Sequence, residues 1–138
     1  MGSSTLTDRA PKPVGAYPHA RRVGNLLFLS GVGPRRPSDG SVPGLQLDAQ
    51  GNLLSYDIAA QCHSVFDNVR NIVEAAGSTW QQIVDVTVFL TDIKRDFSTF
   101  NALYAEAFAD NQPTRTTVEV NALPTPIAIE LKVIATID

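Results

Sequence analysis

Apolar and polar residues alternate along two runs near the C-terminus, residues 113–120 and 127–137. A period of two is typical of β-strands, in which successive side chains point to opposite faces of the sheet. In the second run, Glu130 is therefore expected on the face opposite the apolar row. In the first run, Arg115 and Thr117 are expected to share a face.

The two runs are able to pair as an antiparallel hairpin centred between Leu123 and Pro124. Thr117 would then lie opposite Glu130, and Arg115 would be a diagonal neighbour of Glu130 at about 7–8 Å. A shift of one residue in register would separate the pair. This hypothesis brings a guanidinium, a hydroxyl and a carboxylate onto one patch of sheet. A surface ion pair is the alternative interpretation of the same pattern.

Residues 56–76 carry the clearest helical pattern. Apolar side chains recur at spacings of four and three along one face, at Ile58, Cys62, Val65, Val69, Ile72 and Ala76. Ser55 is the expected N-cap and Gly77 the expected C′ residue. A second helix is predicted over residues 97–109, with Asp96 as its cap.

The remaining segments predict strands and one long loop. Residues 23–29 predict a hairpin tip followed by a buried strand that ends at Ser30, and residues 83–90 predict a further strand. Residues 33–54 are rich in Gly, Pro, Ser and Asp, which is typical of a loop, with a small hairpin turned at residues 50–52. Loops of this length in compact domains are usually functional or disordered.

The order of these elements predicts a layered architecture. Because each helix is apolar along one stripe only, we expect an α+β fold in which a single mixed sheet carries two helices on one face. The other face would carry Thr117, Glu130 and Phe89 beside the apolar Ile134. Such a mixture is too apolar to be left wholly to water. Copies of the chain are therefore expected to cover it in a closed symmetric oligomer.

The composition is that of one ordinary globular domain over residues 1–138, with 43% hydrophobic and 18% charged residues. The net charge of −3 argues against a nucleic-acid partner. No apolar run approaches the roughly 20 residues that a membrane helix needs. Residues 1–10 are expected to be flexible and show no signal-peptide pattern, so a cytoplasmic location is expected.

Few residues are suited to metal binding or to nucleophilic catalysis. The histidines are His19 and His63, and the single cysteine, Cys62, belongs to the apolar stripe of the first helix. No zinc motif, phosphate-binding glycine loop or Ser/His/Asp arrangement is recognisable. A reaction without metal or cofactor, on a small molecule that carries a carboxylate, fits these residues.

Several segments together resemble the reactive-intermediate (enamine/imine) deaminase family. They are Arg115–Val120 with Leu123-Pro124 and Ile129-Glu130-Leu131, Val86–Asp92, Phe100–Tyr104, Ala59–Gln61 and Ser30-Gly31. The resemblance extends from about Val14 to the C-terminus. It implies a chorismate-mutase-like fold and a homotrimer whose sheets face inward, with active sites in the clefts between subunits. Residues 31–37 and 123–130 are most similar to the 2-aminomuconate deaminases of the family.

The resemblance also implies a reaction, the hydrolysis of an enamine or imine with release of ammonia. In the first interpretation, 2-aminomuconate is converted to 4-oxalocrotonate and ammonia. Two alternatives stay open. One is a broad-specificity deaminase of 2-imino acids that repairs metabolites, and the other is a non-catalytic oligomer that binds small ligands.

Residue by residue, the resemblance places a site on both C-terminal runs. Arg115 is the expected anchor for the substrate carboxylate, because guanidinium binds carboxylate through a two-point fork. Glu130 is the expected acid and base. The expected substrate-binding residues are Tyr17, Ser30, Gly31, Val32, Phe89, Thr117 and Pro124. A dicarboxylate substrate would need a second cation, for which Lys132, Arg35 and Arg36 are the candidates.

Overall fold

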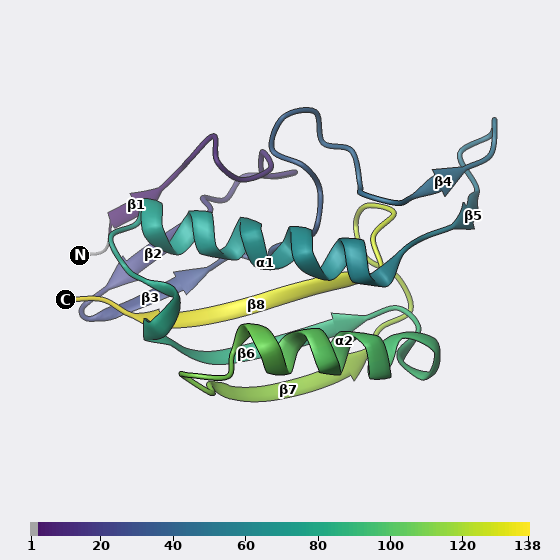
Figure 1. Ribbon diagram of the computed structural model, residues 1–138. Coiled ribbons are helices and arrows are strands. Elements are labelled where there is room, and N and C mark those ends of the chain that lie inside the picture. Colours follow the sequence, from purple (N-terminus) through teal and green to yellow (C-terminus); the bar gives the residue numbers. More distant parts are fainter. Residues whose placement is uncertain (1–2) are drawn as a thin grey trace.

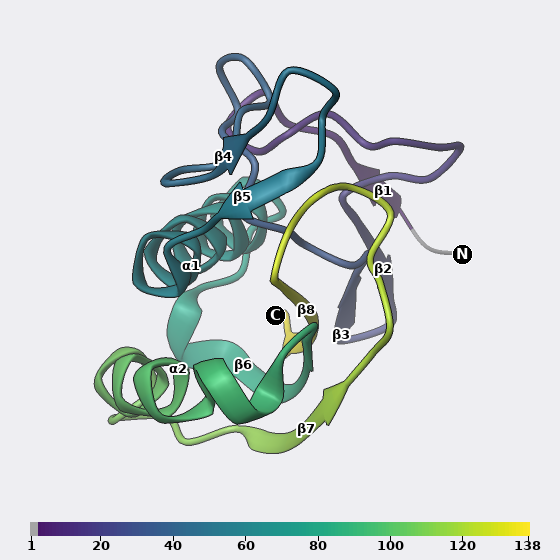
Figure 2. The same ribbon diagram turned by 90° about the vertical axis from the view of Figure 1, so that its right-hand side faces the viewer.

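A six-stranded mixed sheet carries two helices on one face in the computed structural model, which describes residues 3–138 (Figure 1). The strands are β1 (Ser3–Thr5), β2 (Ala20–Val23), β3 (Leu26–Leu29), β6 (Ile83–Leu90), β7 (Thr114–Glu119) and β8 (Ile129–Thr136), in the spatial order β1-β2-β3-β8-β6-β7. Helices α1 (Ile58–Ala75) and α2 (Ile93–Ala107) lie on the same side of the sheet (Figure 2). The predicted α+β fold is confirmed.

The core lies between the helices and the sheet. Leu131 and Val133 of β8 are fully buried there, together with Val65 and Val69 of α1. Because successive strand residues point to opposite faces, Glu130 projects from the other face of β8, as the alternation predicted. We call this second face, which the helices do not cover, the open face.

The predicted hairpin between the two C-terminal runs is wrong. Strand β6 lies between β7 and β8, pairing in parallel with β7 and antiparallel with β8. Helix α2 returns the chain from β6 to a parallel neighbour, so β7 takes the outer edge of the sheet. Residues 120–128 then carry the chain back across the end of β6 to β8, which is a longer path than a tight turn allows (Figure 2).

Both helices begin at a different residue from the predicted one. Asp57 caps α1 in place of Ser55, and its side chain accepts a hydrogen bond from the Ala60 amide. Asp92 caps α2 in place of Asp96. In each case two residues with capping side chains lie within one turn of each other, so propensity alone does not choose between them. The predicted C′ residue, Gly77, has the expected positive φ of 94°.

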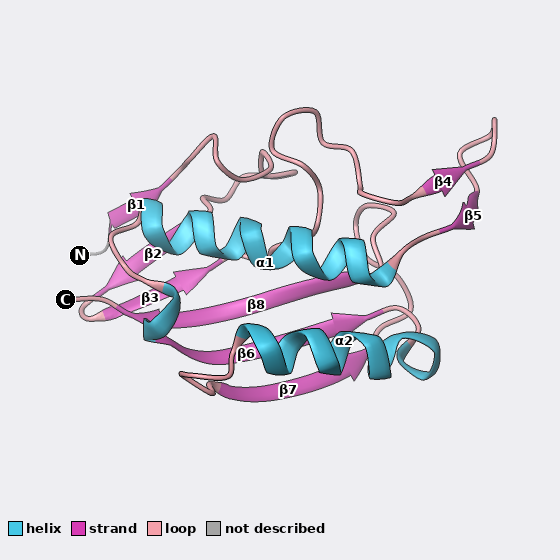
Figure 3. Cartoon of the chain, viewed as in Figure 1, coloured by secondary structure: helices cyan, strands magenta, loops and turns pink. Residues whose placement is uncertain are grey.

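The peripheral segments are coloured as strands and loops in Figure 3. Strands β4 (Gln46–Leu47) and β5 (Leu53–Ser55) form the small hairpin predicted in the long loop, and η1 (Trp80–Gln82) is a short 3₁₀ turn before β6. Met1 and Gly2, part of the segment predicted to be flexible, lie outside the described residues. Ser3–Thr5 pairs with β2 as an edge strand that the sequence did not predict.

Candidate active site

Glu130 occupies a cleft on the open face of the sheet. Phe89 of β6 lies directly opposite it in the strand register. Gly31 follows β3 and approaches the carboxyl so closely that a Cβ built on it would lie 2.9 Å from Glu130 Cδ and Oε2. A residue with a side chain would displace the carboxyl, so Gly31 makes room for Glu130.

The residues around this carboxyl enclose a small cavity of about 50 Å³. Its lining includes Tyr17, Gly31, Arg35, Pro124 and Glu130. A neighbouring cavity of about 30 Å³ shares Tyr17, Gly31 and Arg35 and adds two further predicted substrate-binding residues, Ser30 and Val32. The residues that line these two cavities, with Phe89, are called the Glu130 cleft below. Most of the site predicted from the sequence is therefore gathered in one place.

The Glu130 carboxyl is half-buried, and this burial raises its pKa above the ordinary value of a glutamate. Burial is the only cause of the shift, so no neighbouring cation or hydrogen-bond donor of the described residues offsets it. A carboxyl with a raised pKa is protonated over a wider pH range and exchanges protons more readily near neutrality. The environment of Glu130 therefore suits an acid and base.

The backbone amides beside Glu130 differ in what they can offer a ligand. The Ser30 amide donates to the His19 carbonyl, and the Val32 amide donates to the Leu131 carbonyl at 2.8 Å. The Ser30 hydroxyl donates to the Pro18 carbonyl at 2.7 Å. Among residues 3–138, the Gly31 amide makes no such backbone hydrogen bond. Of these three amides, that of Gly31 is thus the one with no backbone acceptor among these residues, which leaves it able to donate to a ligand oxygen.

Arg115 lies in a second group of residues on the helix side of the sheet. It pairs in register with the buried Val86, and its guanidinium donates to Asn101 Oδ1 of α2 at 2.9 Å. Three aromatic rings of the same helix face the guanidinium, with ring centres at 4.7 Å (Tyr104), 5.4 Å (Phe100) and 5.9 Å (Phe97). Contact with aromatic faces stabilises the cation and restricts its orientation. Arg115, Asn101 and these rings are called the Arg115 cluster below.

Thr117 shares the face of Arg115, as predicted, because it pairs with the buried Val88. The prediction that Thr117 also shares a face with Glu130 is wrong, since Phe89 is the residue of β6 beside Glu130. Within residues 3–138 the buried Thr117 hydroxyl has no hydrogen-bond partner. One chain therefore presents the expected anchor and the expected acid on opposite faces of its sheet.

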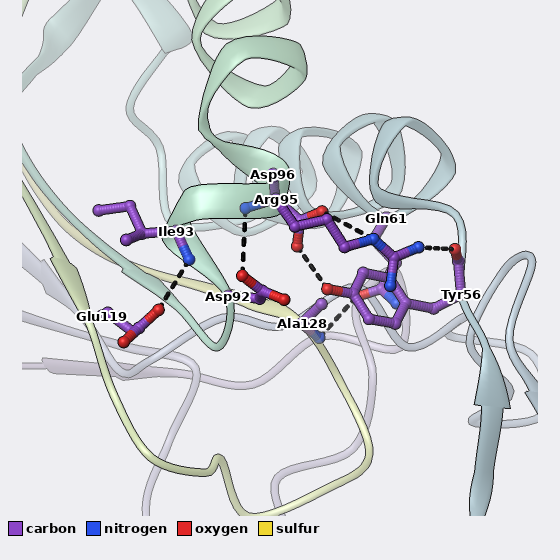
Figure 4. Close-up of polar contacts among 8 residues, drawn as sticks. All are labelled: Tyr56, Gln61, Asp92, Ile93, Arg95, Asp96, Glu119 and Ala128. Carbon is purple, nitrogen blue, oxygen red and sulfur yellow. Dashed lines mark hydrogen bonds and ion pairs between the residues drawn. The ribbon is translucent and has the colours of Figure 1, made fainter.

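A polar network that the sequence did not predict holds the connection between β7 and β8 (Figure 4). Gln61 of α1 is fully buried and accepts a hydrogen bond from the Ala128 amide at 2.8 Å. The Tyr56 hydroxyl donates to the buried Asp96 at 2.5 Å, and Arg95 stacks on the Tyr56 ring at 4.2 Å. Gln61 thereby fixes the end of the segment that carries Pro124. In the sequence, the signal for this hydrogen bond was the polar Gln61 within an amphipathic helix, because a buried polar side chain needs a partner.

His19 holds the N-terminal arm in place. The His19 ring lies between the Thr7 amide, which donates to Nδ1, and the Pro11 carbonyl, which is 2.7 Å from Nε2. It ties the N-terminal arm to β2. In the described part of the chain, no three His, Cys, Asp or Glu side chains come together as metal ligands. Over the same residues, neither α1 nor α2 has the length and hydrophobicity of a membrane-spanning helix.

Comparison with known proteins assigns the family. The family model described as endoribonuclease L-PSP matches residues 7–137. A RutC family protein of Pyrococcus horikoshii is 38% identical over 135 residues, covering 98% of each chain. The 2-iminobutanoate/2-iminopropanoate deaminase of Escherichia coli is 38% identical over 138 residues, again covering 98% of each chain. The chain belongs to the endoribonuclease L-PSP family.

Solved structures of this family share the fold. The YjgF gene product of Escherichia coli superposes with a TM-score of 0.83 at 37% identity, covering 97% of this chain and 98% of the other. RidA from an Antarctic Psychrobacter gives a TM-score of 0.84 at 31% identity, covering 98% and 99%. The expected chorismate-mutase-like fold and the expected resemblance to enamine/imine deaminases are both confirmed. No 2-aminomuconate deaminase is among these relatives.

Proposed function

We propose that this protein is a cofactor-independent deaminase that hydrolyses 2-imino acids to 2-oxo acids and ammonia. The observation that carries the proposal is the half-buried Glu130 carboxyl, held against Gly31 in a cleft with its pKa raised by burial alone. The name of the Escherichia coli relative, 38% identical, supports the same reaction class. That relative favours a small 2-imino acid over 2-aminomuconate as the substrate.

The reaction needs one acid and base, one anchor and one water molecule. An enamine first tautomerises to the imine, whose carbon is electrophilic. Water adds to that carbon while Glu130 takes one of its protons and passes it to the nitrogen, which gives a carbinolamine. Glu130 then transfers the hydroxyl proton to the nitrogen, the C–N bond breaks, and ammonia leaves as the carbonyl forms. Arg115 binds the substrate carboxylate through its fork. Imine and water are consumed, and 2-oxo acid and ammonia are produced, so the step balances without a cofactor.

The proposed site lies between copies of the chain. Arg115 and Glu130 occupy opposite faces of one sheet, so a neighbouring copy has to supply one of them. The open face favours such an assembly, because it carries exposed apolar side chains at Val23, Leu26 and Val118. We propose a homotrimer whose open faces point inward, with the Arg115 cluster of one subunit meeting the Glu130 cleft of the next.

Mixed oligomers provide the test. Arg115→Ala and Glu130→Gln are each expected to abolish ammonia release from 2-iminobutanoate generated by an amino-acid oxidase. Co-expression of the two variants with different tags should restore part of the activity, because some interfaces then combine an intact Arg115 with an intact Glu130. No restoration in verified mixed trimers would overturn the shared site. Substrate binding by the wild type without ammonia release would instead support a non-catalytic oligomer.

A second candidate substrate is 2-aminomuconate, with 4-oxalocrotonate as the product. The observation that favours it is that Arg35 and Glu130 line the same cavity, since a second cation suits a substrate with two carboxylates. The name of the matched family, endoribonuclease L-PSP, also suggests RNA cleavage as a function. The net charge of −3 gives that activity little support. Ribonuclease activity that disappears in Glu130→Gln would count against the deaminase.

A further inference from the structure

The extended loop that begins at Gly33 contributes one arginine to the lining of the Glu130 cleft. Arg35 lines both cavities of the cleft, whereas Arg36 is exposed and donates from Nη1 to the Ser41 hydroxyl at 2.6 Å. Lys132, the third candidate cation, projects from the open face and donates to the Leu29 carbonyl. Of these three, Arg35 is thus the one that lines both cavities of the Glu130 cleft.

The backbone around Arg35 is held by α1. The buried Asn68 donates from Nδ2 to the Gly33 carbonyl at 2.9 Å and to the Arg35 carbonyl at 2.8 Å. The Ser64 hydroxyl donates to the Pro34 carbonyl at 2.6 Å. Three successive carbonyls are therefore fixed to one rigid helix. The side chain of Arg35 starts from a well-defined point, which reduces the entropy lost when it binds a ligand.

Most hydrogen-bond donors of the Arg35 guanidinium have no partner among the described residues. Its Nη2 donates to the Lys12 carbonyl at 3.0 Å. Among residues 3–138, no carboxylate lies within ion-pair distance of it. A guanidinium carries five N–H donors, so most of them are available to a ligand. Glu130 does not neutralise this charge, because burial is the only cause acting on its pKa.

A guanidinium that lines a cavity and has no carboxylate partner favours an anionic ligand. We propose that Arg35 is a specificity-determining residue that binds the distal carboxylate of the substrate, so that the preferred substrates are 2-imino or 2-enamino dicarboxylates. This inference rests on the proposed function, in which Arg115 of a neighbouring copy holds the carboxylate next to the imine carbon. Two guanidiniums then bracket a substrate with an acid at each end, with Glu130 between them.

The test compares two imino acids that differ by a second carboxylate. Amino-acid oxidases generate 2-iminoglutarate and 2-iminobutanoate, and kcat/KM for release of ammonia is measured for each. We expect the wild type to prefer 2-iminoglutarate. Arg35→Gln, which retains an amide donor for the Lys12 carbonyl, should lower the ratio of the two kcat/KM values by roughly tenfold to a hundredfold, as is typical for hydrogen bonds to a charged group. The loss should appear mainly in KM for the dicarboxylate.

Arg36→Gln is the matched control, because it removes the same charge one residue along the chain. It should leave the ratio unchanged. Equal losses on both substrates in Arg35→Gln, or the same change of ratio in Arg36→Gln, would overturn the assignment.

A binding measurement separates this inference from the proposed function. Calorimetry compares 2-oxoglutarate with 2-oxobutanoate, the two corresponding products, on wild type and Arg35→Gln. If no ammonia is released from either imine, the proposed function fails, and preferential binding of 2-oxoglutarate that depends on Arg35 would still support the dicarboxylate site. Equal binding of both oxo acids by the wild type would defeat it.

Discussion

The Glu130 cleft and the Arg115 cluster treat their charged groups in opposite ways. The Glu130 carboxyl is partly shielded from water and has no ion-pair partner within residues 3–138, so burial raises its pKa and favours the gain and loss of a proton. Around Arg115 it adds an amide oxygen and three aromatic rings, so the guanidinium stays charged and oriented. A group that transfers protons needs a changeable charge, and an anchor needs a permanent one. The contrast is the reason for assigning the two roles as we do.

The largest expected effect is on proton transfer. Glu130→Gln keeps the size of the side chain but removes its ability to exchange a proton at neutral pH. We expect kcat for 2-iminobutanoate to fall by about 10²–10⁴-fold, with KM changed far less. Steady-state kinetics on the purified oligomer measures both constants. An Arg115→Lys variant should show the reverse pattern, with the larger change in KM, and a dominant kcat effect in both variants would erase the contrast.

The next effect concerns the space that Gly31 leaves for the carboxyl. Gly31→Ala would put a Cβ within 2.9 Å of Glu130 Cδ, although the backbone at Gly31 does not have positive φ. We expect kcat to fall by tens to a hundredfold, on the order expected when a catalytic group is misplaced by about an ångström. Gly33→Ala is the comparison, since its Cβ would meet only the end of the Ile127 side chain. A loss as large in Gly33→Ala would show that crowding of the whole cleft is responsible.

A smaller effect should come from the residue that positions the anchor. Asn101→Ala removes the hydrogen bond to Arg115 but leaves the aromatic rings in place. Because Asn101 acts through Arg115, we expect KM to rise by roughly tenfold with kcat nearly constant. Asn101→Gln retains a neutral amide acceptor and should recover part of the affinity. A change confined to kcat or to thermal stability would mean that Asn101 does not position Arg115.

The smallest expected effect is on stability, and it depends on pH. Because the pKa of Glu130 is raised on folding, the folded state binds more protons than the unfolded state between the two pKa values. Folding stability therefore decreases as the pH rises through this window, which lies above the ordinary range of glutamate. Glu130→Gln should unfold at a higher temperature than the wild type at pH 7, and the difference should narrow at pH 4. The exposed Glu106, changed to Gln, is the control.

Features that depend on local periodicity were predictable, and features that depend on distant segments were not. The helices and long strands were found because their periodicity is local. The caps at Asp57 and Asp92 were missed because Ser55 and Asp96 have equally suitable side chains, and the burial of Asp96 against Tyr56 involves a distant segment. Strand β1 was missed because Ser3–Thr5 is polar and is held by backbone hydrogen bonds to β2, which leave no hydrophobic pattern.

The sequence predicted more of the Glu130 cleft than of the Arg115 cluster. The residues of the Glu130 cleft came from the resemblance to the deaminase family, and the structure gathers Tyr17, Gly31 and Pro124 around Glu130. The partner of Arg115 was not predictable, since nothing local in Asn101 distinguishes it from a solvated helix residue. The sequence also did not show which of Arg35 and Arg36 lines the cleft, because a loop has no periodicity that assigns adjacent residues to different sides.

By itself, the sequence determined the type of each main element, the single layer of helices and the face of β8 on which Glu130 lies. These features follow from the periods of two residues in a strand and 3.6 residues in a helix. Each period can be recognised within one short segment of the sequence. Only the tertiary structure decided that β6 separates β7 from β8, and hence that Arg115 and Glu130 face opposite ways. Which strands become neighbours depends on the burial and chain entropy of the whole fold, because pairing joins segments that are remote in sequence.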